Sequence, residues 1–481
     1  MNRFSKALAL TVTGALSSAA LSSAALAAAA LPPPEPAFRA IYQEMVETNT
    51  TLSVGDCSRI TVATAAKLAA AGYPAADVQI IAPADRPTKS NIVAILHGSQ
   101  SGQAGQSRRA ILLLAHIDVV EAKREDWVRD PFKLVEEDGY FYGRGTADDK
   151  SMAAIFVDAM LRYKQSGYRP KRDIKLALTC GEETPNDFDG AKYLAEHHRD
   201  LIDAELALNE GGGGRMSPDG KLLYNGVQAG EKVYQDYRLE ITNPGGHSSR
   251  PVPDNAIYRL AAALTRLQGY AFPIQFNDAT RGFFARMAKI EAGQSALDMP
   301  AVLRTPPDAA ALARLQQNPS YNAILHTTCV ATLLDGGHAP NGLPQRAGAN
   351  VNCRIFPGVT QESVRQTLEH VVADPGIKVS FVDAPEQVSP APPLTRAILG
   401  PIEAITEAMW PGVPVVPSMA AGATDGRFLT PAGIPTYGVS GIFSDPATTN
   451  AHGLNERVRV QSLYEGREFL DRLIKAYADR K

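Results

Sequence analysis

Three short, largely apolar runs constrain the fold of this chain more than any other feature. They are AILLLAHID (110–118), IKLALT (174–179) and AELALNE (204–210), and segments with helical spacing at 151–166 and 191–202 separate them. A strand that is apolar at successive positions is buried on both faces, as in a parallel sheet covered by helices. The alternation therefore predicts an α/β domain with a mostly parallel sheet between two helical layers. In such sheets, ligands bind beyond the carboxyl ends of the strands.

The pattern changes after residue 232. Residues 233–241 alternate between polar and apolar, as a half-solvated antiparallel strand does. The elements predicted from here on follow the order β-α-β-β-α-β of a ferredoxin-like unit, once the polar stretch 270–325 is set aside. That stretch is too long for a plain loop, so we expect some helix within it. The sequence thus predicts one domain formed by 28–232 and 385–481, with a second domain, 233–384, inserted into it.

The N-terminus has the layout of a secretory signal peptide over residues 1–27. Arg3 and Lys6 precede a stretch of apolar and small residues that ends in Ala25-Leu26-Ala27. A membrane anchor is the alternative, but the many Ser and Ala residues make the stretch weakly apolar. We therefore expect a periplasmic or secreted protein with no membrane contact after cleavage. The net charge of −3 provides no basic field for nucleic acid.

Export would permit disulfide bonds among the four cysteines, Cys57, Cys180, Cys329 and Cys353. Their spacing is not that of a zinc knuckle. Cys329 and Cys353 lie on consecutive predicted strands and could pair, and the alternative is that they are buried free thiols.

Side chains of the types that bind metals stand at or just past the predicted strand ends. They are His116 and Asp118 in HID, Asp148 and Asp149 in GRGTADDK, Glu182 and Glu183 in TCGEE, Glu210 in ALNEGGGG and His452 in AHGLNE. Taken alone, HID is compatible with a core histidine, and GRGTADDK with a helix N-cap or a phosphate loop. Taken together, the motifs supply the mixture of imidazole and carboxylate that two Zn²⁺ ions bind. Such a carboxylate cluster would be strongly destabilising without cations.

The motifs HID, GRGTADDK, TCGEE, ALNEGG, GGHSSRP and AHGLNE resemble, in this order, those of the M20 family of metallopeptidases. That family comprises dizinc carboxypeptidases, acylases and desuccinylases. The ALNEGGGG motif and the long insertion are most similar to its secreted branch, which handles N-acyl amino acids. The resemblance implies a zinc-peptidase-like three-layer catalytic domain with an inserted ferredoxin-like lid, through which relatives often dimerise.

The resemblance also implies a set of metal ligands. His116 and Glu210 would bind one Zn²⁺, His452 and Glu183 would bind the other, and Asp148 would bridge both. Co²⁺ or Mn²⁺ could occupy the same nitrogen and oxygen sites. The peptide bond after the bridging aspartate is typically cis in the family.

Three further residues receive catalytic roles from the resemblance. Asp118 would orient His116. Glu182 would act as general base and acid, taking a proton from a water held between the two zinc ions and passing it to the leaving nitrogen. His247, in GGHSSRP, would stabilise the oxyanion. An ordinary loop histidine is the alternative for His247.

The same resemblance implies a substrate site formed by Arg354, Asn341, Gly422, Thr424 and Arg427. A guanidinium fork suits a carboxylate, although an ordinary surface arginine is the alternative for Arg354. A glutamate at position 210, where relatives that recognise a free α-amine often have aspartate, favours an N-blocked substrate.

The sequence therefore predicts an exported dizinc carboxypeptidase or N-acyl-amino-acid hydrolase acting on small peptides or N-acyl amino acids, with a homodimer through the lid as a possible assembly. An exported dipeptidase of the same family is one alternative. Another is an inactive homologue that binds metals or peptides, and the presence of Glu182 with all five ligand positions argues against it.

Overall fold

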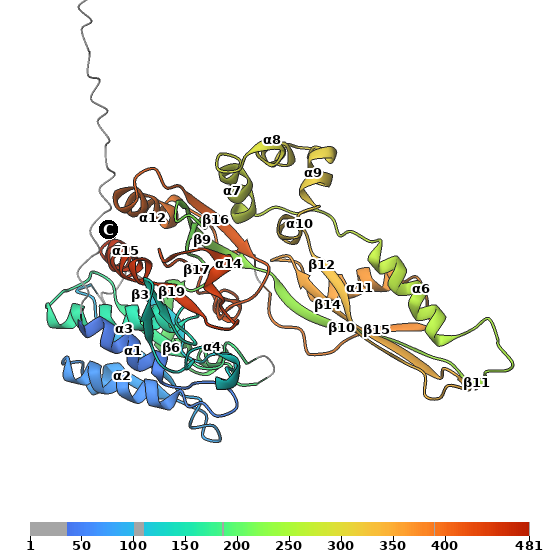
Figure 1. Cartoon of the computed structure of the whole chain (residues 1–481), viewed down its shortest axis with the longest axis horizontal. Coiled ribbons are helices and arrows are strands. Elements are labelled where there is room, and N and C mark those ends of the chain that lie inside the picture. Colours follow the sequence, from blue (N-terminus) through green and yellow to red (C-terminus); the bar gives the residue numbers. More distant parts are fainter. Residues whose placement is uncertain (1–35, 101–109, 185–186, 389, 481) are drawn as a thin grey trace, which may run out of the picture.

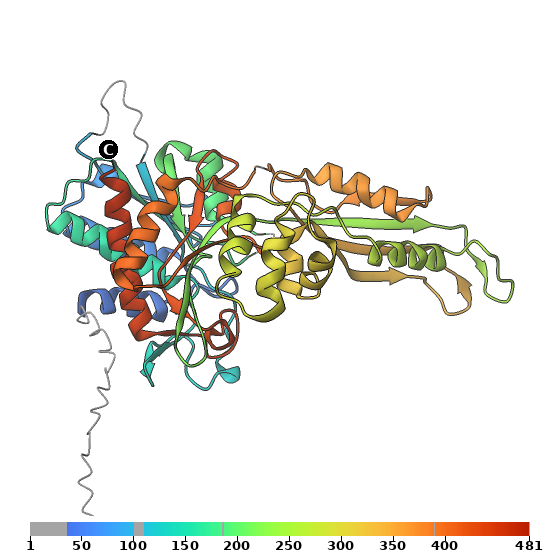
Figure 2. The same ribbon diagram turned by 90° about the horizontal axis from the view of Figure 1, so that it is seen from above.

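The computed structural model describes residues 36–100, 110–184, 187–388 and 390–480. The predicted signal peptide at 1–27 lies outside these residues. Figures 1 and 2 show a broad α/β body, the catalytic domain, from which an elongated lid extends. Within the described residues, no helix is both long and apolar enough to cross a membrane.

A ten-stranded sheet forms the centre of the catalytic domain, and the pairs that carry the apolar runs are parallel. β3 pairs in parallel with β6 on one side and β7 on the other, and β7 pairs in parallel with β17. The strands of this sheet are β1 (Val78–Ile81), β2 (Asn91–Leu96), β3 (Ala110–His116), β6 (Ile174–Thr179), β7 (Ala204–Asn209), β8 (Gly214–Met216), β9 (Leu222–Glu231), β16 (Val415–Ala420), β17 (Thr436–Gly438) and β18 (Phe443–Ser444).

Helices cover both faces of this sheet, which confirms the predicted mostly parallel α/β architecture. Successive residues of β3 belong to different clusters, since Ile111 and Leu113 pack on one side and Leu112 and Leu114 on the other. The first face is covered by α1 (Pro36–Glu47), α2 (Ser58–Ala70), α3 (Lys150–Gln165), α12 (Arg396–Met409) and α15 (Val460–Ala478). The second is covered by α4 (Gly190–His197), α5 (Arg199–Ile202) and α13 (Gly426–Leu429). The single helix predicted at 191–202 is divided into α4 and α5 at His198.

The lid is a four-stranded antiparallel sheet in the order β12-β14-β10-β15, with α6 and α11 packed against it. Chain order and strand order together are those of a ferredoxin-like unit, as predicted. Its elements are β10 (Val233–Thr242), α6 (Ala256–Gln268), β12 (Thr328–Gly336), β14 (Arg346–Ile355), α11 (Gln361–Val372) and β15 (Ile377–Phe381). At its far end β11 (Gly246–His247) pairs with β13 (Gly342–Leu343).

The expected helical content of 270–325 is present as four helices. They are α7 (Asp278–Met287), α8 (Gly293–Val302), α9 (Ala309–Leu315) and α10 (Pro319–Leu325). Their cluster includes Phe284, Met299 and Leu315, and it also includes Val416 of β16. The segment thus interrupts the lid in sequence but packs against the catalytic domain, at the junction of the two bodies in Figures 1 and 2 (yellow).

Two disulfide bonds join the four cysteines. Cys329 and Cys353 face each other across β12 and β14 and are bonded, which confirms the predicted pair. Cys57 is bonded to Cys180, a pairing that the sequence does not indicate because the two lie 123 residues apart. This second bond anchors the end of β6, directly before Glu182 and Glu183, to the start of α2.

Removing the Cys57–Cys180 bond should cost more stability than removing the lid bond. The two close loops of 123 and 24 residues, for which loop entropy gives about 5 and about 3.5 kcal/mol. We expect chemical denaturation to show a larger loss of unfolding free energy for the double variant Cys57→Ala/Cys180→Ala than for the matched variant Cys329→Ala/Cys353→Ala. An equal or smaller loss of unfolding free energy in the Cys57→Ala/Cys180→Ala variant would contradict the expectation that the longer loop contributes more stability.

Candidate active site

Three neighbouring strands carry the predicted site residues to one edge of the central sheet. His116 is the last residue of β3, the Glu182–Glu183 pair follows β6, and Glu210 directly follows β7. The carboxyl ends of neighbouring parallel strands meet at the same edge, so the side chains of these residues converge. Asp148 joins them from the turn before α3.

Asp148 lies between the two histidines. Its Oδ1 is 3.1 Å from Nε2 of His116, and its Oδ2 is 3.0 Å from Nε2 of His452. His452 Nε2 is also 2.9 Å from an oxygen of Glu183, and His116 Nε2 is 3.7 Å from an oxygen of Glu210. One carboxylate therefore faces two separate His–Glu pairs, the arrangement expected of a bridging ligand.

The charges in this cluster shift one another's pKa values. Hydrogen bonds that His452 donates to Asp148 and Glu183 raise its pKa to about 10. Burial alone would lower the pKa of His116, but the hydrogen bond to Asp148 and the charge of Glu210 raise it well above its usual value. Burial raises the pKa of Glu210, and the charge of Asp148 adds to this effect. Without a metal ion, protons on the histidines thus compensate the carboxylates.

The donor set fits divalent cations. Ligand atoms of His116, Asp148 and Glu183 lie within 4.8 Å of one another, as do those of His116, Glu182 and Glu210. Imidazole nitrogen and carboxylate oxygen suit Zn²⁺, and a carboxylate cluster gains most from a cation. The two groups share His116 and differ from the predicted division of ligands, because one contains Glu182 and neither contains His452.

This charge distribution predicts a stability that falls as pH rises in the metal-free protein. The folded pKa values of Glu182, about 7, and His452, about 10, exceed the usual values of about 4.3 and 6.5. The folded state therefore binds more protons than the unfolded state between these limits, so the free energy of unfolding decreases with pH. We expect the melting temperature with chelator to fall from about pH 6 to about pH 9, and zinc to reduce the slope. A flat or rising profile with chelator would contradict this coupling.

Glu182 is the residue of the cluster that is predicted to act as general base. It follows Gly181, whose φ of +109° turns the chain at the strand end. Burial raises the pKa of Glu182 to about 7, with further increases from the charges of Glu183, Asp118 and Asp148. A carboxyl group that titrates near neutrality suits a general base.

Asp118 acts on the backbone of this turn. Its carboxylate accepts hydrogen bonds from the backbone N–H groups of residues 181, 182 and 183 at 2.6, 3.2 and 3.0 Å. The Nδ1 of His116 is 3.1 Å from the backbone oxygen of Asp118 but 3.8 Å from its carboxylate. Asp118 therefore orients His116 through its backbone oxygen and not, as predicted, through its carboxylate. The carboxylate instead holds the turn that carries Glu182 and Glu183.

Glu456 organises the other turn, and sequence reasoning missed this role. Its buried carboxylate accepts hydrogen bonds from the backbone N–H groups of Gly145, Ala147 and Asp148 and from Arg144 Nη1 at 2.7 Å. The available signal was its place at the end of the AHGLNE motif, four residues after His452. Glu456 thus links the two loops that hold Asp148 and His452.

Asp149 does not cap α3 with its side chain, although it occupies the N-cap position. The Asp148–Asp149 peptide bond is cis, as the resemblance implied.

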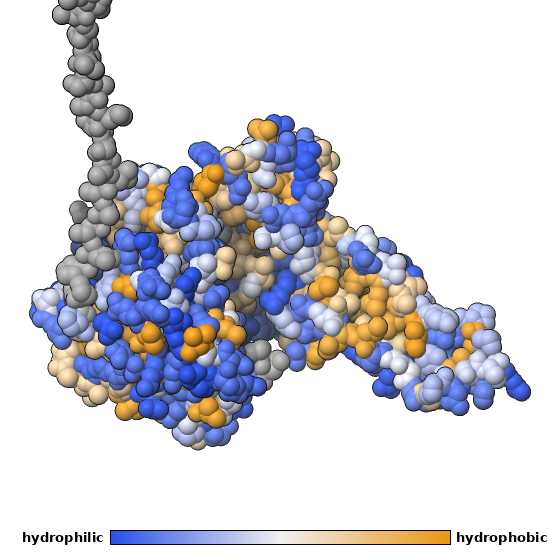
Figure 3. All heavy atoms as spheres, in the orientation of Figure 1, coloured by the Kyte–Doolittle hydropathy of each residue, from blue (hydrophilic) through white to orange (hydrophobic). Residues whose placement is uncertain are grey.

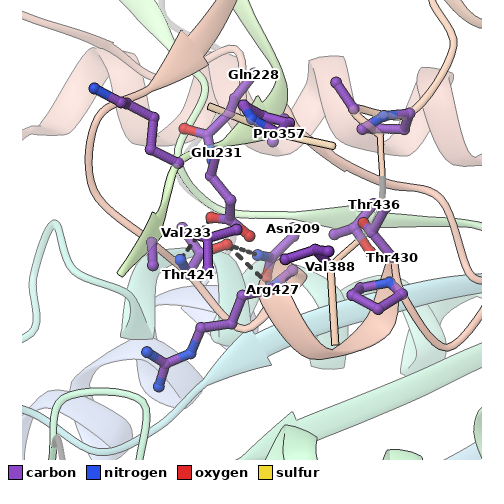
Figure 4. A pocket seen from close by; sticks show the side chains of 18 of the residues that line it. Asn209, Gln228, Glu231, Val233, Pro357, Val388, Thr424, Arg427, Thr430 and Thr436 are labelled. Carbon is purple, nitrogen blue, oxygen red and sulfur yellow. Dashed lines mark hydrogen bonds between the residues drawn. The ribbon is translucent and has the colours of Figure 1, made fainter. Parts of the chain in front are cut away.

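Some of the predicted substrate residues lie near the cluster. Arg354 of β14 is half-buried with its guanidinium 4.7 Å from the centre of the Tyr234 ring, and Arg427 is the second residue of α13. The Thr424 hydroxyl accepts a hydrogen bond from Asn209, the residue before Glu210. Thr424 and Arg427 line the pocket of Figure 4. Gly422 is exposed, with no atom within 4 Å of where its Cβ would stand.

His247 and Asn341 are not brought to this cluster. His247 is exposed on β11, and its Nδ1 accepts hydrogen bonds from Ser249. Ser248 N donates to the backbone oxygen of Asn341, so the two predicted residues lie side by side at the far end of the lid. Figure 1 shows that end remote from the catalytic sheet. Sequence order cannot reveal this separation, because it depends on the length of β10 and on the lid's orientation.

Comparison with known proteins decides the family. The sequence model described as Peptidase family M20/M25/M40 matches residues 112–476. The chain belongs to this family. This M20 chain is 29% identical over 376 residues to the N-fatty-acyl-amino acid synthase/hydrolase PM20D1 of Homo sapiens, covering 76% of the chain and 74% of the relative. It is 25% identical over 382 residues to aminoacylase-1 of Mus musculus, covering 77% and 80%.

Solved structures show the same fold. The M20 metallo-carboxypeptidase Sso-CP2 from Sulfolobus solfataricus matches with a TM-score of 0.65 and 17% identity, over 92% of this chain and 99% of that one. Human carnosine dipeptidase 1 matches with a TM-score of 0.58 and 15% identity, over 92% and 97%. The chain is an M20 family hydrolase with the catalytic and inserted lid domains of that fold.

Proposed function

We propose that this M20 protein is an exported dizinc hydrolase that cleaves the amide bond of N-acyl amino acids or of the C-terminal residue of small peptides. The observation that carries the proposal is the position of Asp148, with one oxygen facing His116 and the other facing His452. The relatives named as an N-fatty-acyl-amino acid synthase/hydrolase and an aminoacylase favour N-acyl amino acids.

His116 and Glu210 would hold one ion, His452 and Glu183 the other, and Asp148 both. Bound divalent ions would polarise the amide carbonyl and lower the pKa of the attacking water. Glu182 would take a proton from the attacking water and deliver it to the leaving nitrogen. Asp118 holds the turn in place during both transfers through its three backbone hydrogen bonds.

Arg354 and Arg427 support a substrate with a carboxylate. Burial lowers the pKa of Arg354, and the charge of Arg427 lowers it further, while Tyr234 and Asp236 act in the opposite direction. An anion between them would relieve the repulsion, and a guanidinium fork is suited to a carboxylate. Relative motion of the lid and the catalytic domain would bring Arg354 and the metal ligands to one substrate.

The lid also supports a homodimer. Val330, Leu333 and Leu334 of β12 are exposed, as are Ile257 and Tyr258 of α6, and Figure 3 shows an apolar patch on this part of the lid. Exposed apolar surface on an edge strand is favourable for pairing with another chain. His247 would then serve the active site of the partner subunit, since it lies far from its own.

A metal-reconstituted activity screen tests the proposal. Protein stripped with chelator and reloaded with Zn²⁺, Co²⁺ or Mn²⁺ is assayed on N-acyl amino acids, on blocked peptides and on free dipeptides. Release of amino acid from the blocked substrates, dependent on metal, is the expected result. Preference for free dipeptides would favour the dipeptidase alternative, and metal binding without turnover of any substrate would favour the inactive homologue.

A further inference from the structure

The pocket of Figure 4 is lined in part by the candidate metal ligand Glu210 and is partly open to solvent. Asn209 and Thr424 line one part of it. Val388, Pro390, Ala391 and Pro392 form an apolar wall, beside which Glu386 and Gln387 add polar groups. It therefore combines an apolar wall with a polar end next to the reacting centre.

Glu231, the last residue of β9, projects into this pocket and has no part in the mechanism above. Its Oε2 accepts a hydrogen bond from the backbone N–H of Thr424 at 2.6 Å. Figure 4 shows its carboxyl directed toward Thr424 and Asn209, with Arg427 extending away from it.

The cations beside Glu231 are engaged elsewhere. Lys232 Nζ donates to the backbone oxygen of Ala323 at 2.8 Å and to the Thr328 hydroxyl at 2.9 Å. Arg427 Nη2 donates to Asp189 at 3.4 Å. Among the described residues, no lysine or arginine nitrogen lies within ion-pair distance of Glu231.

An ionised carboxylate in this position is costly unless a cation reaches it. Burial raises the pKa of Glu231 to about 8, and the hydrogen bonds from Thr424 offset only part of this rise. A positively charged group in the pocket would favour the carboxylate and gain a charge-assisted hydrogen bond.

We propose that Glu231 is a specificity-determining residue that receives a cationic side chain on the amino-acid part of the substrate. The inference rests on the proposed function, in which Arg354 and Arg427 hold the carboxylate of that same residue at the pocket entrance. Val388 and the neighbouring prolines also line the pocket, so an aliphatic stem can contact them while its charged end faces Glu231. An N-acyl-lysine has such a stem with an ammonium end.

The test compares N-acetyl-lysine with N-acetyl-norleucine, which has the same stem without the ammonium group. With zinc-loaded protein, we expect kcat/KM to be about ten- to hundred-fold higher for the lysine substrate. Glu231→Gln keeps the shape and the acceptor for Thr424, so it should reduce the ratio of kcat/KM between the lysine and norleucine substrates to about one. Glu196→Gln, which removes a charge from the exposed face of α4, should leave the ratio as it is.

A binding measurement separates specificity from catalysis. In the Glu182→Gln background, calorimetry should show that N-acetyl-lysine binds more tightly than N-acetyl-norleucine, and that Glu231→Gln equalises the two. Equal turnover and binding of both substrates by the unaltered pocket, or an equal loss of both in Glu231→Gln, would overturn the proposal. Failure to cleave any N-acyl amino acid would instead overturn the proposed function.

Discussion

Replacing Glu182 with Gln should lower kcat by about 10²- to 10⁴-fold while both metal ions stay bound. The amide keeps the shape of the side chain but cannot accept the proton of the attacking water. The hydrogen bonds that hold this turn go to the backbone N–H groups of residues 181–183, so they do not depend on the side chain at 182. Steady-state kinetics together with metal content by elemental analysis checks both parts of the expectation.

Glu183→Gln is the matched control. It alters the adjacent carboxylate, which faces His452 at 2.9 Å, and should reduce metal content as well as turnover. If Glu182→Gln keeps near-normal activity, Glu182 is not the base. If it loses metal to the same extent as Glu183→Gln, the division of roles within the pair is wrong.

Replacing Arg144 with Met should destabilise the protein by about 3–5 kcal/mol, because it leaves a buried carboxylate without its cation. Both partners of the Arg144–Glu456 pair are buried, with side-chain exposures of 3% and 0%. Glu456 would keep its backbone hydrogen bonds to the turn at 145–148 but lose the charge that compensates it. Thermal and chemical denaturation of the metal-loaded protein measures the effect.

Two further variants make this result specific. The double variant Arg144→Met/Glu456→Leu should recover part of the loss, since no buried charge remains, but it should still bind metal weakly because the turn that carries Asp148 loses its acceptor. Arg472→Met removes one side of the exposed Arg472–Glu468 pair and should cost less than about 1 kcal/mol. Equal losses for Arg144→Met and Arg472→Met would contradict the importance of the buried pair.

The convergence of the metal-binding side chains could be predicted because it depends on chain direction. His116 and Glu210 follow runs that are apolar on both faces, so both had to stand at one edge of a parallel sheet. The role of Asp118 could be predicted only in part. Its position two residues after His116 placed it in the site, but nothing in the sequence indicates that three N–H groups from the next strand end would compete for its carboxylate.

Other features depend on contacts between segments remote in sequence, and no local pattern encodes them. The Cys57–Cys180 bond joins α2 to the end of β6, and Glu456 reaches a turn more than 300 residues earlier. The helices α7–α10 were expected as helix, but their packing against Val416 of β16 was not. In each case the sequence pattern predicts the local helix or strand, whereas tertiary packing decides which distant segment it contacts.

That packing changes how the lid can move. A simple inserted domain would be joined to its host by two strands of backbone and could swing freely about them. Here the chain leaves the lid after α6, rests on the catalytic domain through α7–α10, and re-enters at β12. Lys232, the single residue between β9 and β10, is tied at the same junction to Ala323 and Thr328. We therefore expect these contacts to restrict the motion of the lid relative to the catalytic domain, so that a substitution in α7–α10 would alter the rate of closure without touching the substrate.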